Sequence, residues 1–482
     1  MTRRDALRYV SALYALTLRG QNLPGQSRPD SFRIYSDGPR LLLRPQRLKL
    51  LRRERERRSL RWDQFETLWT ANAQFPELGW AQALRYRIAD DREAGTRAVA
   101  WAVGPADAGM LDDVRQMAII ADWCAPMISG DDKSQLVAKL QRAATDPRPV
   151  KTLAEARAKI FAAIALADAL PAVGEKALET VFDGFWNGFI ASLRNAKSAV
   201  SNADAYAMLE ILHAVRDNLN FDLHETFPEW FKQYPLLHLL AHYPAPWPAA
   251  ENEFHIPADE TIAKTGPDVR KAALSRAAEL AMVAYDANAA SSQLLQGWVT
   301  NDRFLMRGTY GIPYELLWAN PYQPGLSYYH APLALHDEIG GQVFVRSSWE
   351  DDASWIGFFG GQLQLFKDGG VAQVDPATAR EPIDIETAIV FFARESKRFS
   401  VSRPDPDKTD PNTTDPNTGE PDKRNNNDAA VFIVGLDPGH SYHVEVDGEE
   451  MSEERADPGG IVYLPAVPGG GVRLADYRPA AL

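Results

Sequence analysis

The residues best suited to chemistry in this sequence are tyrosines that lie close to a polar residue able to handle charge. Asn202 precedes Tyr206 by four residues at the start of a segment with helical apolar spacing, so both side chains are expected on nearly the same face of a helix. An amide can neutralise a carboxylate, and a phenol can donate or accept a proton. The same spacing also fits an asparagine that caps the helix and a tyrosine that is buried in the core.

A second group of this kind lies between residues 307 and 330. Arg307 and Tyr310 offer the same two roles, and His330 is placed to assist a proton transfer. Further tyrosines in this stretch, suited to stacking on sugar rings, are Tyr314, Tyr322, Tyr328 and Tyr329. A packed seam between two domains is the alternative explanation for this density of aromatic residues.

No metal site and no cofactor is predicted. His238 and His242 lie four residues apart on one expected helix face, but Leu239 stands where a zinc protease needs a glutamate, so a structural role is expected. Cys124 is the single cysteine, which excludes a disulfide within the chain and a cysteine-based zinc site. The sequence also lacks a glycine-rich phosphate loop and a Gly-x-Ser-x-Gly nucleophile motif.

The charge of the chain is unevenly distributed. Residues 1–60 contain 15 Lys and Arg against 5 Asp and Glu, a net charge of +10, whereas the whole chain has a net charge of −13. The remaining residues therefore carry −23, which argues against general electrostatic binding of nucleic acid. No apolar run reaches the roughly 20 residues that a membrane-spanning helix needs.

The N-terminus has features of an export signal. Arg3 and Arg4 resemble the start of a twin-arginine signal, and the ten uncharged residues 9–18 suit a short apolar region. An ordinary first helix with basic residues at one end is the alternative. With the signal, residues 1–37 form a leader, and the mature protein is expected to be periplasmic or secreted.

Residues 38–305 have the apolar spacing of successive α-helices. The clearest segments, rich in alanine and leucine, are 77–90, 111–128, 153–170, 175–194 and 268–287. Short connectors that contain proline, glycine or small polar residues separate the helices, which must bury their apolar faces on one another. A stacked or toroidal array of helix pairs is therefore predicted.

Beyond about residue 306 the pattern changes to short strands. Aromatic and β-branched segments punctuated by glycine predict strands over 341–347, 354–360, 362–366, 385–393 and 399–401. Their spacing of roughly ten residues indicates a β-sandwich over 306–402. Residues 403–428 contain no apolar residue except proline and are predicted to be a disordered acidic insertion. The strands expected in residues 429–482 either complete the sandwich or form a small β-domain.

The order of a helical array and then a β-sandwich, joined to particular stretches, resembles one enzyme family. Gly38-Pro39-Arg40-Leu-Leu-Leu opens the array, Arg115-Gln-Met-Ala-Ile-Ile-Ala-Asp122-Trp123 lies within it, and Gly340-Gly-Gln-Val-Phe-Val-Arg346-Ser-Ser-Trp349 opens the sandwich. These stretches resemble the heparinase II/III-like polysaccharide lyases and related alginate lyases. The resemblance implies an α+β multidomain protein with an N-terminal (α/α) toroid, a C-terminal antiparallel β-sandwich and a polysaccharide bound between them.

Enzymes of this family cleave uronate-containing polysaccharides by β-elimination, which needs an acid/base and a group that neutralises the sugar carboxylate. The resemblance implies Tyr206 or Tyr310 as the acid/base, Asn202 or Arg307 as the neutralising group, and His330 as a helper. The metal-binding histidines of the family have no counterpart in the corresponding strand of this chain, so a non-catalytic saccharide-binding or surface protein with the same fold is the alternative. A glycoside hydrolase is a third possibility, and it needs two carboxylates that face one cleft.

Overall fold

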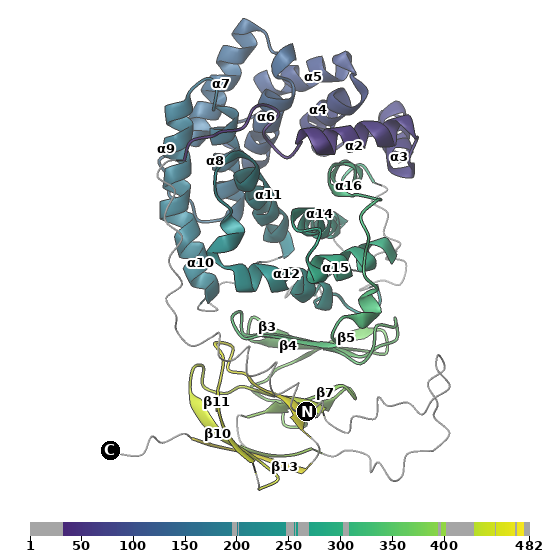
Figure 1. Cartoon of the computed structure of the whole chain (residues 1–482), viewed down its shortest axis with the longest axis vertical. Coiled ribbons are helices and arrows are strands. Elements are labelled where there is room, and N and C mark those ends of the chain that lie inside the picture. Colours follow the sequence, from purple (N-terminus) through teal and green to yellow (C-terminus); the bar gives the residue numbers. More distant parts are fainter. Residues whose placement is uncertain are drawn as a thin grey trace.

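The structure is a computed structural model of the chain, and it describes residues 32–194, 200, 202–246, 255, 257–258, 269–301, 308–393, 397–401, 429–448, 450–467 and 470–476. Helices make up the first part of the chain and sheets the last part, and the two parts lie at opposite ends of an elongated molecule (Figure 1). The prediction of a helical region followed by largely antiparallel sheets is confirmed. Most of the predicted leader and the whole of the predicted insertion lie outside the described residues.

The α-helices follow one another through short connections, and local signals explain where several of them start. Their bounds are α2 (Pro45–Glu56), α3 (Leu60–Thr70), α4 (Leu78–Ala89), α5 (Arg92–Val103), α6 (Leu111–Trp123), α7 (Gly130–Ala144), α8 (Leu153–Ala165), α9 (Pro171–Val181), α10 (Asn187–Arg194), α11 (Asn202–Asn218), α12 (Pro228–Leu240), α14 (Val269–Tyr285), α15 (Ala290–Asn301) and α16 (Ile312–Trp318). Thr152 and Glu155 form a capping box at the start of α8, and Pro171 and Pro228 begin α9 and α12. Within the ranges described, no helix is both long and apolar enough to cross a lipid bilayer.

Helices that are not neighbours along the chain pack against one another in a cycle of contacts. Helix α4 packs against α6, α6 against α8, α8 against α11, α11 against α14, and α14 against α16. Helix α16 packs in turn against α2 and α3, and α2 packs against α4, which closes the ring. We call α2, α4, α6, α8, α11, α14 and α16 the ring helices. Other helices pack against members of the ring: α5 against α4, α7 and α9 against α8, and α15 against α14.

The described strands begin at Ala334 and form three sheets. Their bounds are β1 (Ala334–Asp337), β2 (Gln342–Arg346), β3 (Trp355–Phe359), β4 (Gln362–Lys367), β5 (Gly370–Val374), β6 (Ile383–Asp384), β7 (Ala388–Phe392), β8 (Arg398–Val401), β9 (Ala429–Val434), β10 (Ser441–Val446), β11 (Glu450–Arg455), β12 (Val462–Val467) and β13 (Gly470–Asp476). The strand orders are β1-β2-β3-β4-β5, β12-β9-β7-β6 and β11-β10-β13-β8. Neighbouring strands are antiparallel except for β7 and β9, which are parallel. Because β9 pairs with β7 and β13 pairs with β8, the strands on either side of the predicted insertion share the same sheets.

The β-region was predicted from residue 306, but the first described strand begins only at Ala334. Helix α16 and a short 3-10 turn at Tyr328–His330 come first. Pro313 favours the first turn of α16. A helix this short is stable mainly through packing, here against α14, α2 and α3. Seven residues are also too few to show a clear helical spacing of apolar residues in the sequence.

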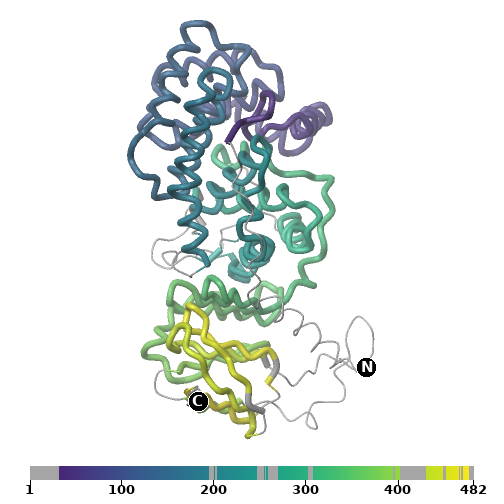
Figure 2. The backbone as a smooth tube through the Cα atoms, turned by 60° about the vertical axis from the view of Figure 1, so that its left-hand side comes forward, coloured from purple at the N-terminus to yellow at the C-terminus, as the bar shows by residue number. Residues whose placement is uncertain are grey.

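Apolar cores join the helices and the three sheets in layers. Aromatic residues of β2, β3 and β4 belong to the same core as the helices, so one face of the five-stranded sheet covers the helical part. Hydrogen bonds also cross this junction: Trp355 Nε1 donates to Leu240 O at 2.8 Å, and Tyr243 Oη donates to Gln364 Oε1 at 2.6 Å. The opposite face packs on the sheet of β7 and β9, whose other face packs on the sheet of β10 and β13. The five-stranded sheet therefore lies between the helices and the other two sheets (Figure 2).

Gly297 of α15 lies where a side chain has no space, and we expect Gly297→Ala to lower the free energy of unfolding by about 1–3 kcal/mol. A Cβ atom here would overlap the carbonyl oxygen of Leu326, whose amide is held by a hydrogen bond to Gln293 O at 2.9 Å. The matched control is Gly188→Ala in α10, where an added Cβ meets nothing within 4 Å. Helix propensity predicts that this control gains up to about 1 kcal/mol. Denaturant unfolding compares the two variants, and equal stability would contradict the close approach at Gly297.

Candidate functional site

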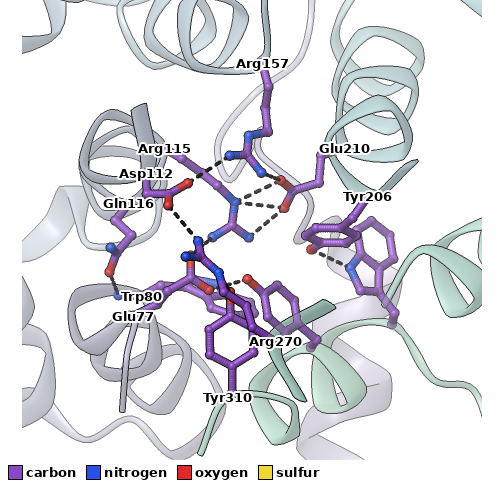
Figure 3. A network of polar contacts seen from close by, with 12 residues as sticks. Glu77, Trp80, Asp112, Arg115, Gln116, Arg157, Tyr206, Glu210, Arg270 and Tyr310 are labelled. Carbon is purple, nitrogen blue, oxygen red and sulfur yellow. Dashed lines mark hydrogen bonds and ion pairs between the residues drawn. The ribbon is translucent and has the colours of Figure 1, made fainter. Parts of the chain in front are cut away.

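The ring helices bring a network of polar and aromatic side chains together (Figure 3). The network contains Glu77, Trp80, Asp112, Arg115, Gln116, Arg157, Tyr206, Glu210, Arg270 and Tyr310, with Tyr314 and Trp318 beside them. Most of these residues lie within the first two turns of a ring helix, so the positive ends of several helix dipoles meet at the network. Such a place suits negatively charged groups, whether they are side chains or parts of a ligand.

The centre of the network is a buried ion pair between Arg115 and Glu210. Both side chains are 0% exposed, and the guanidinium donates from Nε to Glu210 Oε2 at 2.8 Å and from Nη2 to Oε1 at 2.6 Å. Arg157 Nη1 donates to Glu210 Oε2 at 3.0 Å. Burial alone would raise the pKa of Glu210, but the charges of Arg115 and Arg157 hold it below its usual value. Glu210 is therefore an ionised partner of two arginines at neutral pH and is not suited to accept a proton.

Glu77 links this centre to the tyrosines of α16 and the turn before it. Arg115 Nη1 donates to Glu77 Oε1 at 2.9 Å, and the Tyr314 hydroxyl donates to Glu77 Oε2. The guanidinium of Arg115 also lies 4.8 Å from the ring centroid of Trp80, within cation–π range. Although burial would lower the pKa of Arg115, the charges of Glu210 and Glu77 raise it well above its usual value. Arg115 is thus a fixed positive charge that is closed off from solvent.

A second set of contacts leads from the centre towards solvent. Arg157 Nη2 donates to Asp112 Oδ1 at 3.2 Å, and Arg270 Nη2 donates to Asp112 Oδ2 at 3.1 Å. Arg270 Nε also donates to the hydroxyl oxygen of Tyr310 at 2.7 Å. The side chains of Asp112 and Arg270 are 52% and 60% exposed, and Tyr310 is half-buried. We call Asp112, Arg270 and Tyr310 the exposed edge of the network.

The hydroxyl of Tyr310 is protonated at neutral pH. Burial and the negative charge of Glu77 raise the pKa of Tyr310, and the opposing effect of Arg270 does not reverse this shift. A neutral phenol beside an arginine is suited to giving a proton to an oxygen leaving group, because the guanidinium stabilises the phenolate that remains. The pKa of Arg270 is itself raised, chiefly by Tyr310, so the arginine stays charged.

Of the two tyrosines predicted as acid/base, the structure places Tyr310 at the exposed edge and Tyr206 in the core. Tyr206 is 1% exposed, and its hydroxyl accepts a hydrogen bond from Trp318 Nε1 at 2.9 Å. Burial and the charge of Glu210 raise the pKa of Tyr206 well above its usual value. Tyr314, predicted to stack on a sugar, is also buried and packs edge-on against Tyr206. Both residues therefore have the core position that was the alternative interpretation for Tyr206.

The loop between α16 and β1 holds the other predicted tyrosines and the predicted histidine. Tyr322, Tyr329 and His330 are exposed, whereas Tyr328 is buried. The ring of Tyr328 stacks on Tyr329 and packs edge-on against Trp349, which follows β2. These contacts fit the alternative interpretation, a packed seam between the helices and the sheets. Within this loop, the exposed residues Tyr322, Tyr329 and His330 are the ones that a ligand can reach.

The charged residues that meet at the network were not predicted from the sequence. Arg307 lies outside the described residues, as does the side chain of Asn202, which begins α11. The residues that the prediction missed are Glu77, Asp112, Arg115, Arg157, Glu210 and Arg270. Three of them carried a signal, since Arg115, Arg157 and Glu210 each interrupt a helix that is otherwise rich in apolar residues. A buried charge needs a partner, but helical periodicity does not show which helix supplies it.

The exposed edge combines three chemical abilities. Arg270 can hold a carboxylate in place of Asp112, since their exposed ion pair contributes only about 0–1 kcal/mol and exchanges readily. Tyr310 can donate a proton, and Asp112 can accept one once it is released. Among the described residues, the side chains best suited to holding a metal ion form a separate cluster where α12 meets α14, which is described below. A comparison with protein-family models found no match, and a search of the curated proteins found none either.

Proposed function

We propose that the chain is a carbohydrate-active enzyme of the polysaccharide lyase type, which cleaves a uronate-containing polysaccharide by β-elimination. The observation that carries the proposal is the exposed edge, where Arg270 contacts both the hydroxyl of Tyr310 and the carboxylate of Asp112. In this proposal the ring helices form an (α/α) toroid, and the sheets that follow form a β-sandwich with one additional sheet. Export to the periplasm or the cell exterior would bring the enzyme to polymers of this kind.

β-Elimination breaks the C5–H and C4–O bonds of a uronate and forms a double bond between C4 and C5. The C5 proton becomes acidic enough when the adjacent carboxylate is neutralised, and Arg270 would do this once the uronate displaces Asp112. Asp112, released from its contact with Arg270, would then be the carboxylate available to take the C5 proton. Tyr310 would protonate the leaving oxygen, since burial and the charge of Glu77 raise its pKa and keep the phenol protonated.

A non-catalytic saccharide-binding protein with the same architecture is the second candidate function. The observation that favours it is the balance of the network, in which three arginines are paired with three carboxylates. A cluster that is already neutral can serve to hold the ring helices together, and the exposed tyrosines of the loop before β1 would then be the surface that contacts a sugar.

The test is the ultraviolet absorbance of the C4–C5 double bond during incubation with alginate, heparan, chondroitin and polygalacturonate chains. We expect a rise with one of these polymers, and a rate about 10²–10³-fold lower for Arg270→Gln, because the variant loses the charge that neutralises the uronate. The matched control is Arg97→Gln, which removes an exposed arginine paired with Glu93 on α5. This control is expected to keep the wild-type rate.

A flat absorbance trace on every polymer, from protein shown to be folded, would reject the lyase proposal. Binding of the same polymers to the wild-type protein, measured by calorimetry, would then support the saccharide-binding candidate. A rise that Arg270→Gln leaves unchanged would establish a lyase but reject the exposed edge as its site.

A further inference from the structure

A cluster of two histidines and a glutamate lies apart from the network, where α12 meets α14. His238 is in α12, His242 follows its last turn, and Glu279 is in α14. The three side chains are at most 2% exposed. Glu279 Oε1 lies 3.2 Å from His238 Nε2 and 3.0 Å from His242 Nε2, so both imidazole nitrogens are directed at one carboxylate oxygen.

The surroundings of His242 determine which of its nitrogens carries a hydrogen. Nδ1 lies 3.0 Å from His238 O and 3.3 Å from Leu239 O, and because backbone carbonyls only accept hydrogen bonds, Nδ1 must be the donor. Nε2 is buried and lies 3.0 Å from Glu279 Oε1, yet it has no hydrogen-bond partner of good geometry. A nitrogen and a carboxylate oxygen this close need a positive charge between them, which either a proton on Nε2 or a metal ion can supply.

The contacts of His238 and Glu279 are compatible with the same interpretation. Ser275 Oγ also lies 3.2 Å from His238 Nε2, and because this nitrogen has one lone pair, an ion bound there would replace any hydrogen bond that the hydroxyl donates to it. The second oxygen of Glu279, Oε2, lies 3.0 Å from Arg276 Nη1. This ion pair orients the carboxylate with Oε1 towards the two imidazoles. Outer contacts of this kind, including the bond from His242 Nδ1 to a carbonyl, orient the ligands of metal sites in proteins.

We propose that His238, His242 and Glu279 bind a divalent transition metal ion, with zinc as the expected occupant. Two imidazole nitrogens and a carboxylate oxygen are ligands that zinc prefers, and the fourth position is left for water. The separations of 3.0 and 3.2 Å are close to the ~3.3 Å edge of a tetrahedron built on ordinary zinc–ligand bonds. All three ligand atoms lie within 4.8 Å of one another.

The ion would fasten α12 to α14 close to the junction between the helices and the sheets. Helix α12 packs against β1 and β2, and α14 is a ring helix, so the cluster connects the ring to the helix that contacts the five-stranded sheet. The role assigned to the metal is therefore structural. The cluster and the exposed edge share no residue, and the proposal does not depend on the lyase function.

The test is metal analysis of the full chain, purified without a histidine tag from cells grown with added zinc. About one zinc ion per chain is expected, as for other structural zinc sites. Removal of the zinc with dipicolinate should lower the melting temperature, and addition of zinc should restore it. His242→Gln and Glu279→Gln should each lose the bound zinc and melt at the lower temperature whether or not zinc is added.

The matched control is His213→Gln, which changes an equally buried histidine outside the cluster. His213 has Nε2 at 2.9 Å from Ala281 O and Nδ1 at 3.2 Å from Arg216, so both of its nitrogens are already satisfied. This variant should keep the zinc.

Several outcomes would overturn the proposal. Zinc retained in both His242→Gln and Glu279→Gln would show that it binds elsewhere. A metal-free wild-type protein whose melting temperature does not respond to zinc would show that the cluster is held by hydrogen bonds alone. If the variants do not fold, cobalt(II) added to the metal-free wild-type protein decides: visible bands of a four-coordinate site support the proposal, and their absence rejects it.

Discussion

Glu210→Gln is expected to lower the free energy of unfolding by about 3–5 kcal/mol, the usual cost of removing one partner from a buried ion pair. The variant keeps the shape of the side chain and removes its charge. Arg115, which is 0% exposed, and Arg157, which is 9% exposed, would then remain in the core with less negative charge to balance them. Denaturant unfolding followed by circular dichroism at neutral pH measures the loss.

The pH dependence of the same variant separates the effect of charge from that of shape. The pKa of Glu210 is lowered in the folded protein, so its ionised form stabilises the fold above the ordinary glutamate pKa, and this contribution is lost as the pH falls through the lowered value. Wild type should therefore approach the stability of Glu210→Gln in acid. A difference in stability that stays constant from neutral pH into acid would contradict the assignment.

The matched control for this experiment is Glu93→Gln on the exposed face of α5. Glu93 is 80% exposed and pairs with Arg97 one turn away. Pairs of this kind contribute about 0.3–0.5 kcal/mol, so the control should behave like wild type at every pH. A loss for Glu210→Gln as small as that of the control would mean that water reaches the two arginines and that the network is not a dry core.

The helices and strands that were predictable are those whose signals are local. The capping box of Thr152 and Glu155 marks a helix start whatever lies around it. Residues 171–174 were predicted to be a connector, but Pro171 instead begins α9, because proline is also favoured in the first turn of a helix. Gly360 and Gly361 both have positive φ angles, of 57° and 72°, and form the tight turn between β3 and β4 that the glycine pair in the sequence indicated. Signals of this type depend on only a few neighbouring residues, so they can be recognised in a single sequence.

The arrangement of the candidate site was not predictable in the same way. Arg115 and Glu210 are 95 positions apart, and Arg270 is 40 positions from Tyr310, so each pairing depends on how the ring closes. Which of Tyr206 and Tyr310 is the candidate acid/base depends on the exposure of the side chain, since both tyrosines lie near polar residues in the sequence. Exposure is set by packing: Trp318 and Tyr314 cover Tyr206, and these residues belong to the short helix that the sequence did not reveal.

Tyr310→Phe is expected to reduce kcat for polysaccharide cleavage by about 10²–10⁴-fold, the usual contribution of a general acid. The variant loses only the hydroxyl that would protonate the leaving oxygen, at a half-buried position beside the exposed Arg270. Its free energy of unfolding should stay within about 1 kcal/mol of wild type. Under the lyase proposal, kcat of the wild-type protein should fall as the pH rises through the raised pKa of Tyr310, because a general acid must be protonated to act.

Tyr206→Phe is the matched comparison, because it makes the same chemical change at the buried tyrosine of the same network. It leaves Trp318 Nε1 without its acceptor in the core, which should lower the free energy of unfolding by about 1–3 kcal/mol, while kcat at a temperature where the variant is folded should match wild type. The two variants are thus expected to show opposite effects, one on chemistry and one on stability. If Tyr206→Phe also lost kcat, the buried tyrosine would take part in the reaction, and the ring helices would have to move apart for a sugar to reach it.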